Sequence, residues 1–68
     1  MTQRTISGAV TQAKLASWLV SNRPDLELWD DRGTKGFYQR SLGPAASFAS
    51  CGPTWRDVAG RLEAVSEQ

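Results

Sequence analysis

The sequence predicts one small α+β domain in which two helices cover the same face of a three-stranded antiparallel sheet. A chain of 68 residues forms one domain at most. Apolar residues recur at helical spacing near both ends, and short strand-like segments separated by glycine and proline lie between them. The simplest packing of this order, helix, three strands and helix, places both helices on one sheet face. Residues 1–10 have a weak pattern and form either a tail or a short edge strand.

The first predicted helix covers residues 11–22, TQAKLASWLVSN. Thr11 is a suitable N-cap residue. Pro24 ends the helix, because the residue before a proline is disfavoured in helical geometry. The apolar face is broad, with three residues at its centre and two on its flanks: Leu15, Ala16, Leu19, Trp18 and Val20.

The middle of the chain predicts a sheet. Its segments are a strand over residues 26–31 (LELWDD), a hairpin connection over 31–36 (DRGTKG), a second strand over 36–42 (GFYQRSL) and a weaker third strand over 45–50 (AASFAS). Alternation directs Leu26 and Leu28 to one face and Trp29 to the other. The face without helices is open, and it carries Trp29 and one of Phe37 or Tyr38, since a shift of one residue in register exchanges these two.

The last predicted helix runs from Trp55 to about Ser66. Thr54 is its N-cap, and Asp57 stands where a capping box has its acidic residue. One apolar stripe follows the i, i+3, i+4, i+7 spacing and anchors the helix on the sheet: Trp55, Val58, Ala59, Leu62 and Val65.

The composition limits the classes of function. Eight basic and seven acidic residues leave a net charge of +1, whereas a nucleic-acid-binding module of this size usually has a clear basic excess. A single cysteine cannot form an internal disulfide and suits a reducing compartment. The N-terminus lacks the apolar core of a signal peptide, and no stretch approaches the roughly 18 apolar residues of a membrane span. These features predict a soluble cytoplasmic protein.

Few residues could carry out catalysis. The chain has no histidine, which excludes Ser-His-Asp and Cys-His catalysis and most zinc sites. Cys51 has no visible base or orienting group, so we interpret it as a packing residue at a strand end. The acidic residues within 25–31 do not match a calcium loop, and RGTKG at 32–36 is not a phosphate-binding loop. We therefore expect no enzymatic activity, no metal and no cofactor.

Two parts of the pattern resemble known families. Residues 36–65 contain a G-F-Y strand, then a glycine, a threonine and a helix with alanine and leucine at core spacing: Gly36, Phe37, Tyr38, Gly52, Thr54, Ala59 and Leu62. This segment resembles the strand-strand-helix part of HicB-type antitoxins and departs from it at Pro53 and Trp55. The resemblance implies a small non-catalytic protein that occludes another macromolecule. The element order also resembles double-stranded RNA-binding domains, but residues 54–58, TWRDV, lack their lysine-rich run, so no RNA-contacting residue is carried over.

The hairpin is the predicted binding region. Trp, Tyr and Arg dominate interface hot spots, so Trp29, Tyr38 and Arg40 are expected to contribute most. Acidic and basic residues around them supply complementary charge. The predicted partner-binding set is therefore Trp29, Asp30, Asp31, Arg32, Lys35, Phe37, Tyr38 and Arg40.

These observations predict a small non-enzymatic module that inhibits or regulates a larger macromolecule by covering a site on it, of the kind that phages and mobile elements encode as anti-CRISPR proteins or antitoxins. The expected partner is a host or cognate protein or a nucleoprotein complex, with no membrane involved, and a homodimer is one way to supplement so small a core. The alternative is a nucleic-acid-binding domain in which aromatic side chains stack on bases and four basic residues hold the backbone: Arg32, Lys35, Arg40 and Arg56.

Overall fold

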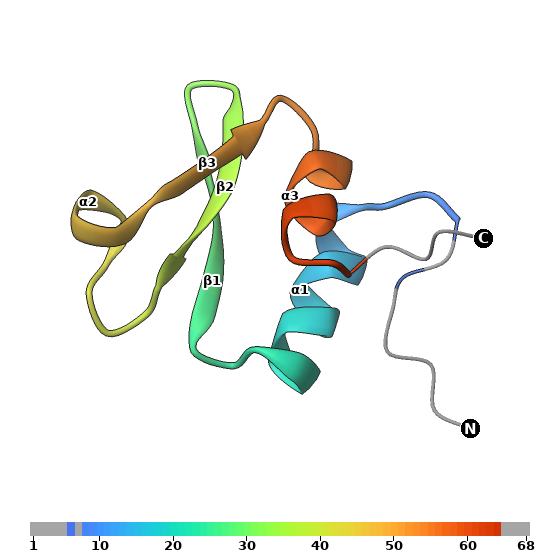
Figure 1. The fold of residues 1–68 in the computed structure, drawn as a ribbon, viewed down its shortest axis with the longest axis horizontal. Helices are drawn as coiled ribbons and strands as arrows, with labels where there is room; N and C mark the ends of the chain where they lie inside the picture. Colours follow the sequence, from blue (N-terminus) through green and yellow to red (C-terminus); the bar gives the residue numbers. More distant parts are fainter. Residues whose placement is uncertain (1–5, 7, 65–68) are drawn as a thin grey trace.

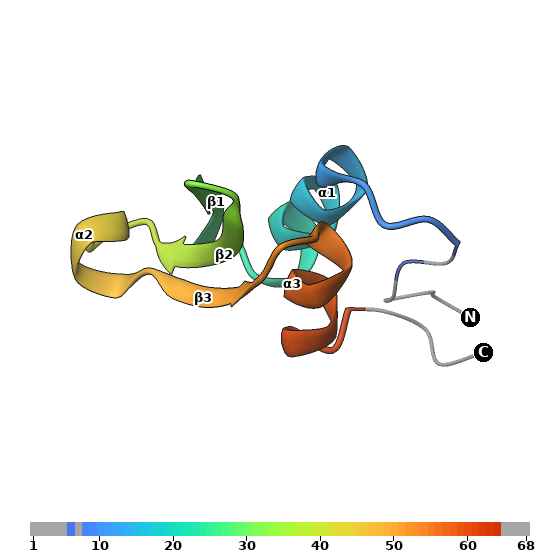
Figure 2. The ribbon, with the colours of Figure 1, turned by 90° about the horizontal axis from the view of Figure 1, so that it is seen from above.

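The computed structural model describes residue 6 and residues 8–64. They form an α+β domain with a three-stranded antiparallel sheet in the order β1-β2-β3 (Figure 1). The two longer helices lie together on one side of the strands (Figure 2), as the sequence predicted. The elements in chain order are α1 (Gln12–Asn22), β1 (Leu26–Asp31), β2 (Thr34–Gln39), α2 (Pro44–Ser47), β3 (Ala49–Gly52) and α3 (Trp55–Arg61).

β1 and β2 form a hairpin with a tighter turn than the sequence predicted. Asp31 pairs with Thr34, so only Arg32 and Gly33 form the turn, and both have positive φ, 56° and 87°. Two such residues fit a type I′ turn, which matches the twist of the flanking strands. The second strand therefore begins at Thr34, and the prediction of a connection over residues 31–36 with a strand over 36–42 was wrong in its boundaries.

The segment after β2 differs most from the prediction. Residues 45–50 were expected to form the third strand, but α2 occupies Pro44–Ser47 and β3 lies at Ala49–Gly52. Pro44 stands in the first turn of α2, where its fixed φ suits a helix and its missing N–H costs nothing. The Ser47 hydroxyl donates to the Gly43 carbonyl (2.8 Å) and accepts from the Gln39 N–H (2.9 Å), which ties α2 to the end of β2.

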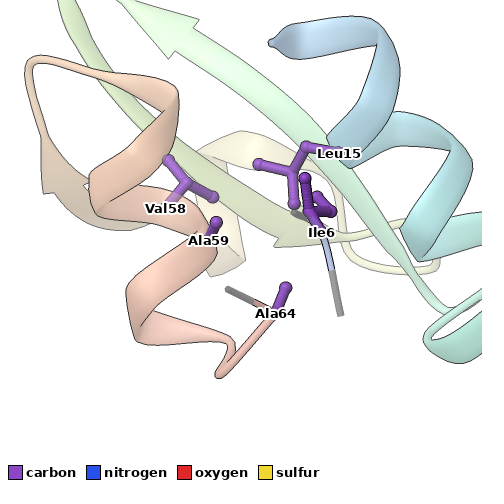
Figure 3. Packing of buried hydrophobic residues seen from close by; sticks show 5 residues of the cluster. All are labelled: Ile6, Leu15, Val58, Ala59 and Ala64. Atoms are coloured by element: carbon purple, nitrogen blue, oxygen red, sulfur yellow. The ribbon is translucent and has the colours of Figure 1, made fainter. Parts of the chain in front are cut away.

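The core lies between the helices and the sheet (Figure 3). Its buried cluster is Ile6, Leu15, Val58, Ala59 and Ala64, and the apolar side chains packed against it include Leu28, Phe37 and Trp55. The centre of the predicted α1 face is confirmed at Leu15 and Leu19, which are buried, but not at Ala16, which is exposed.

Both predicted helix N-termini are confirmed. The Thr11 hydroxyl accepts from the Lys14 N–H (3.2 Å), and Thr54 forms a complete capping box with Asp57. α3 ends earlier than expected, at Arg61, because Glu63 adopts a φ of 57° and the Ala64 N–H turns back to the Ala59 carbonyl (2.7 Å). This hydrogen bond is part of a Schellman C-cap, which ends a helix.

Of residues 1–10, the structure describes Ile6 and residues 8–10. Ile6 is buried, and its N–H donates to the Ala64 carbonyl at 2.6 Å. The choice between a tail and an edge strand for the rest of this segment, and the predicted core role of Val65, lie outside the described residues. No helix within the described ranges is long and apolar enough to cross a membrane.

Candidate functional site

The sheet face opposite α1 and α3 carries aromatic side chains. The Trp29 and Tyr38 rings are in contact edge to face, with centroids 6.0 Å apart and planes at 85°. Trp29 is 43% exposed, which is unusual for so large an apolar side chain. The sequence predicted Trp29 on this face, and the register resolves the alternative left open beside it: Tyr38, and not Phe37, accompanies Trp29.

Phe48 completes this surface, and sequence reasoning missed it. Gly36 is the cross-strand partner of Trp29, and a Cβ added to Gly36 would lie 2.9 Å from two carbons of the Phe48 ring. Cross-strand partners direct their side chains to the same face, so the Phe48 ring covers Gly36 on the side of Trp29. A glycine inside a strand signals such a close approach. We call Trp29, Tyr38 and Phe48 the aromatic face.

A charged pair borders the aromatic face at the end of the hairpin away from the turn. Arg40 Nη2 lies 2.8 Å from Glu27 Oε1, and both side chains are about half exposed. Glu27 is the cross-strand partner of Tyr38, so the pair adjoins the aromatic rings. Exposed ion pairs stabilise a fold by little, about 0–1 kcal/mol, and their charges remain available to a partner.

The other predicted site residues are divided between the turn and the helix side of the sheet. Asp31 and Arg32 are exposed at the turn. Asp30 and Lys35 lie on the helix side, where Lys35 Nζ is 3.1 Å from the Asp30 carboxylate and 5.5 Å from the centroid of the Trp55 ring. Phe37 also faces the helices and packs against the core. The structure thus brings Trp29, Tyr38 and Arg40 together and separates Lys35 and Phe37 from them.

Cys51 lies in an irregular part of β3. Lys35 pairs with Gly52 and Gly36 pairs with Ser50, so Cys51 is the extra residue of a β-bulge. Its side chain is half-buried, and the thiol donates to the Ala49 carbonyl at 3.7 Å. Burial raises the pKa of the Cys51 thiol, and the nearby Arg61 only partly opposes this. The environment therefore favours the neutral thiol, which is a poor nucleophile.

The described residues contain no group of three or more His, Cys, Asp or Glu side chains that could hold a metal ion. Comparisons with protein-family models, curated proteins and solved structures found no match to this chain. A functional assignment therefore rests on the geometry of the chain itself.

Proposed function

We propose that this protein is a small non-enzymatic binding module that inhibits or regulates a larger macromolecule by covering a site on it with the aromatic face. The observation that carries the proposal is the exposure of Trp29, flanked by Tyr38 and Phe48 and bordered by the Glu27–Arg40 pair. Rigid aromatic side chains and arginine are the residue types that dominate interface hot spots.

The surroundings of the aromatic face also favour a protein partner. Trp29 is held by its contact with Tyr38 and by the paired strands beneath it, so little conformational entropy is lost when a partner covers it. The Glu27–Arg40 pair offers one charge of each sign at the rim, which suits a partner surface with both signs.

The partner that we propose is a host or cognate protein or a nucleoprotein complex in a reducing compartment such as the cytoplasm. The resemblance of residues 36–65 to HicB-type antitoxins and the small size of the chain favour an inhibitor of the phage or mobile-element type, for example an antitoxin or an anti-CRISPR protein.

A nucleic-acid partner is the weaker proposal. Two of the four basic residues that it needs lie on opposite faces of the sheet, Lys35 on the helix side and Arg40 beside the aromatic face, and each stands next to a carboxylate that would repel a phosphate group. Such a partner predicts retardation of DNA or RNA in a gel-shift titration at low salt, with an affinity that falls steeply as salt rises. A protein partner predicts no retardation in the same titration.

The test is capture of partners from the source cell on the immobilised full chain, followed by mass spectrometry and a binding measurement with the recovered partner. Trp29→Ala is expected to weaken binding by about tenfold or more, as truncation of a hot-spot residue does. Leu42→Ala, at another exposed apolar residue (58% exposed), is the matched control and should bind as the parent chain does. Unchanged binding by Trp29→Ala, or a loss of thermal stability that unfolds the domain, would overturn the proposal.

A further inference from the structure

We propose that an extended peptide segment of another protein binds along the outer edge of β1 as a fourth strand and inserts an apolar side chain into the groove between β1 and α1. The groove shares the Glu27–Arg40 pair with the border of the aromatic face but includes none of its three aromatic residues, so the inference goes beyond the proposed function and does not rest on it. Three observations carry it: the free backbone groups of β1, the groove beside them, and the contrast between the two edges of the sheet.

The backbone of β1 offers hydrogen-bonding groups at regular intervals. The Arg40 N–H donates to the Asp25 carbonyl (2.9 Å), which fixes the alternation of the antiparallel ladder. Residues 27, 29 and 31 then bond to β2, whereas Leu26, Leu28 and Asp30 direct their backbone groups away from it. The Leu26 N–H donates to the Arg23 carbonyl. Among the described residues, the Leu26 carbonyl, both Leu28 groups and the Asp30 N–H have no partner, and they match the alternation of one added strand.

A groove of about 320 Å³ lies beside this edge. Most of the residues that line it are apolar and come from α1, the following loop and β1: Ala16, Leu19, Val20, Pro24, Leu26 and Leu28. Gln12, Glu27 and Arg40 supply its polar part. The volume is at the lower limit of ligand pockets, which suits one or two side chains of a peptide better than a large cofactor. Val20 is 67% exposed at the groove, so an apolar side chain seated there would cover it.

The two edges of the sheet differ in how well they are protected. β3 has four residues, contains the bulge at Cys51 and is followed directly by Pro53, all of which discourage strand addition. β1 has six residues in unbroken register and no proline, and its protection is limited to the charges of Glu27, Asp30 and Asp31. A long edge strand in unbroken register is a template for pairing with another chain.

A second copy of this chain fits the β1 edge less well. Antiparallel pairing centred on Leu28 would set Asp30 of one copy beside Leu26 of the other. Leu26 is only 4% exposed, so this pairing would desolvate a carboxylate next to a buried apolar side chain. A different segment can place an apolar residue there instead.

The test is a selection of random peptides displayed on phage against the immobilised full chain, followed by binding measurements with the selected peptides. We expect enrichment of peptides with apolar residues at alternate positions. Val20→Lys should weaken their binding by about tenfold or more, because a seated apolar side chain would desolvate the ammonium group. Ser21→Lys introduces the same lysine at the next position of α1, which is also exposed. It is the matched control, and it should bind the selected peptides as tightly as the parent chain does.

Amide hydrogen exchange supplies the second readout. In the free protein the Leu28 and Asp30 amides should exchange faster than those of Glu27 and Trp29, which bond to β2. A bound peptide should slow exchange at Leu28 and Asp30 specifically. N-methylation of the peptide amides that face β1 should abolish binding, whereas methylation of the other amides should not.

Several outcomes would overturn the inference. They are a failure to enrich any peptide, equal binding to Val20→Lys, or no added protection at Leu28 and Asp30. Loss of peptide binding in Trp29→Ala instead would move the peptide to the aromatic face, which overturns this inference and supports the proposed function. A dimer in sedimentation equilibrium that Val20→Lys dissociates would make a second copy the occupant.

Discussion

Among the described glycines, Gly36 should be the one whose replacement with alanine destabilises the domain most. A Cβ at Gly36 would overlap the Ala49 carbonyl oxygen and come within 2.9 Å of the Phe48 ring. The ring could rotate aside, but the carbonyl belongs to β3, and Ala49 is paired with Phe37. The methyl group therefore fits only if β3 moves away from β2.

The magnitude follows from this geometry. Overpacking a well-packed site costs about 1–3 kcal/mol, and the upper end applies because backbone must move. At roughly 0.05–0.15 kcal/mol per residue, a domain of this length has a total stability of about 3–10 kcal/mol. A loss of about 3 kcal/mol would lower the melting temperature by about 12–24 °C, since each kcal/mol shifts Tm by about 4–8 °C in a domain of this size.

Gly60→Ala is the matched control. Gly60 lies within α3, and a Cβ added there would meet nothing within 4 Å. Because alanine favours a helix more than glycine does, this variant should gain about 0.5–1 kcal/mol. Both variants are compared with the parent chain by circular dichroism during heating and in urea. A Tm of Gly36→Ala within about 2 °C of the parent would refute the close approach of β3 to Gly36.

Three further predictions concern single side chains. Thr54→Ala should cost about 1–2 kcal/mol in urea unfolding, because it removes both hydrogen bonds of the Thr54 hydroxyl, the one accepted from the Asp57 N–H and the one donated to the Asp57 carboxylate; an unchanged midpoint would contradict this. In an NMR titration the pKa of Asp25 should lie below the ordinary carboxyl value, owing first to its hydrogen bond from Arg23, and Arg23→Gln should raise this pKa. The stabilisation by this pair is present above the ordinary carboxyl pKa, and it is lost as the pH falls through the lowered pKa of Asp25. At pH 8 iodoacetamide should alkylate Cys51 more slowly in the folded protein than in urea, since burial raises the thiol pKa, and equal rates would contradict the half-buried environment.

Local signals determined which elements were predictable from the sequence. The capping box at Thr54 and the alternation of LELWDD act over a few residues, and both elements begin where they were predicted. The same alternation placed Trp29 on the open face. These elements are specified by neighbours in the chain, so their prediction needed no knowledge of the tertiary structure.

Other features depend on contacts between distant segments. The turn at Arg32–Gly33 requires a positive φ at arginine, which is not one of the residues that typically indicate such a turn. Without that turn the register of β2 was open, and so was the choice between Phe37 and Tyr38. Small Ala and Ser residues after Pro44 have little strand preference, and the hydrogen bonds of Ser47 favour a helical turn instead. The groove between α1 and β1 has no counterpart in the sequence pattern, because it forms where two elements meet.

The exposure of Trp29 leads from the proposed function to a prediction about the stability of this domain. A chain of this size buries only about 60% of its unfolded surface, so a large apolar side chain in the core would contribute strongly to stability. Among the described residues, Trp18 and Trp55 pack against the buried core of Leu, Ile, Val and Ala side chains, whereas Trp29 faces solvent. A partner that covers Trp29 would supply the missing burial and stabilise the fold by mass action, about 2.7 kcal/mol at a partner concentration of 100 times Kd. The thermal stability of this small domain should therefore report directly on occupancy of the aromatic face, and Trp29→Ala should remove that response.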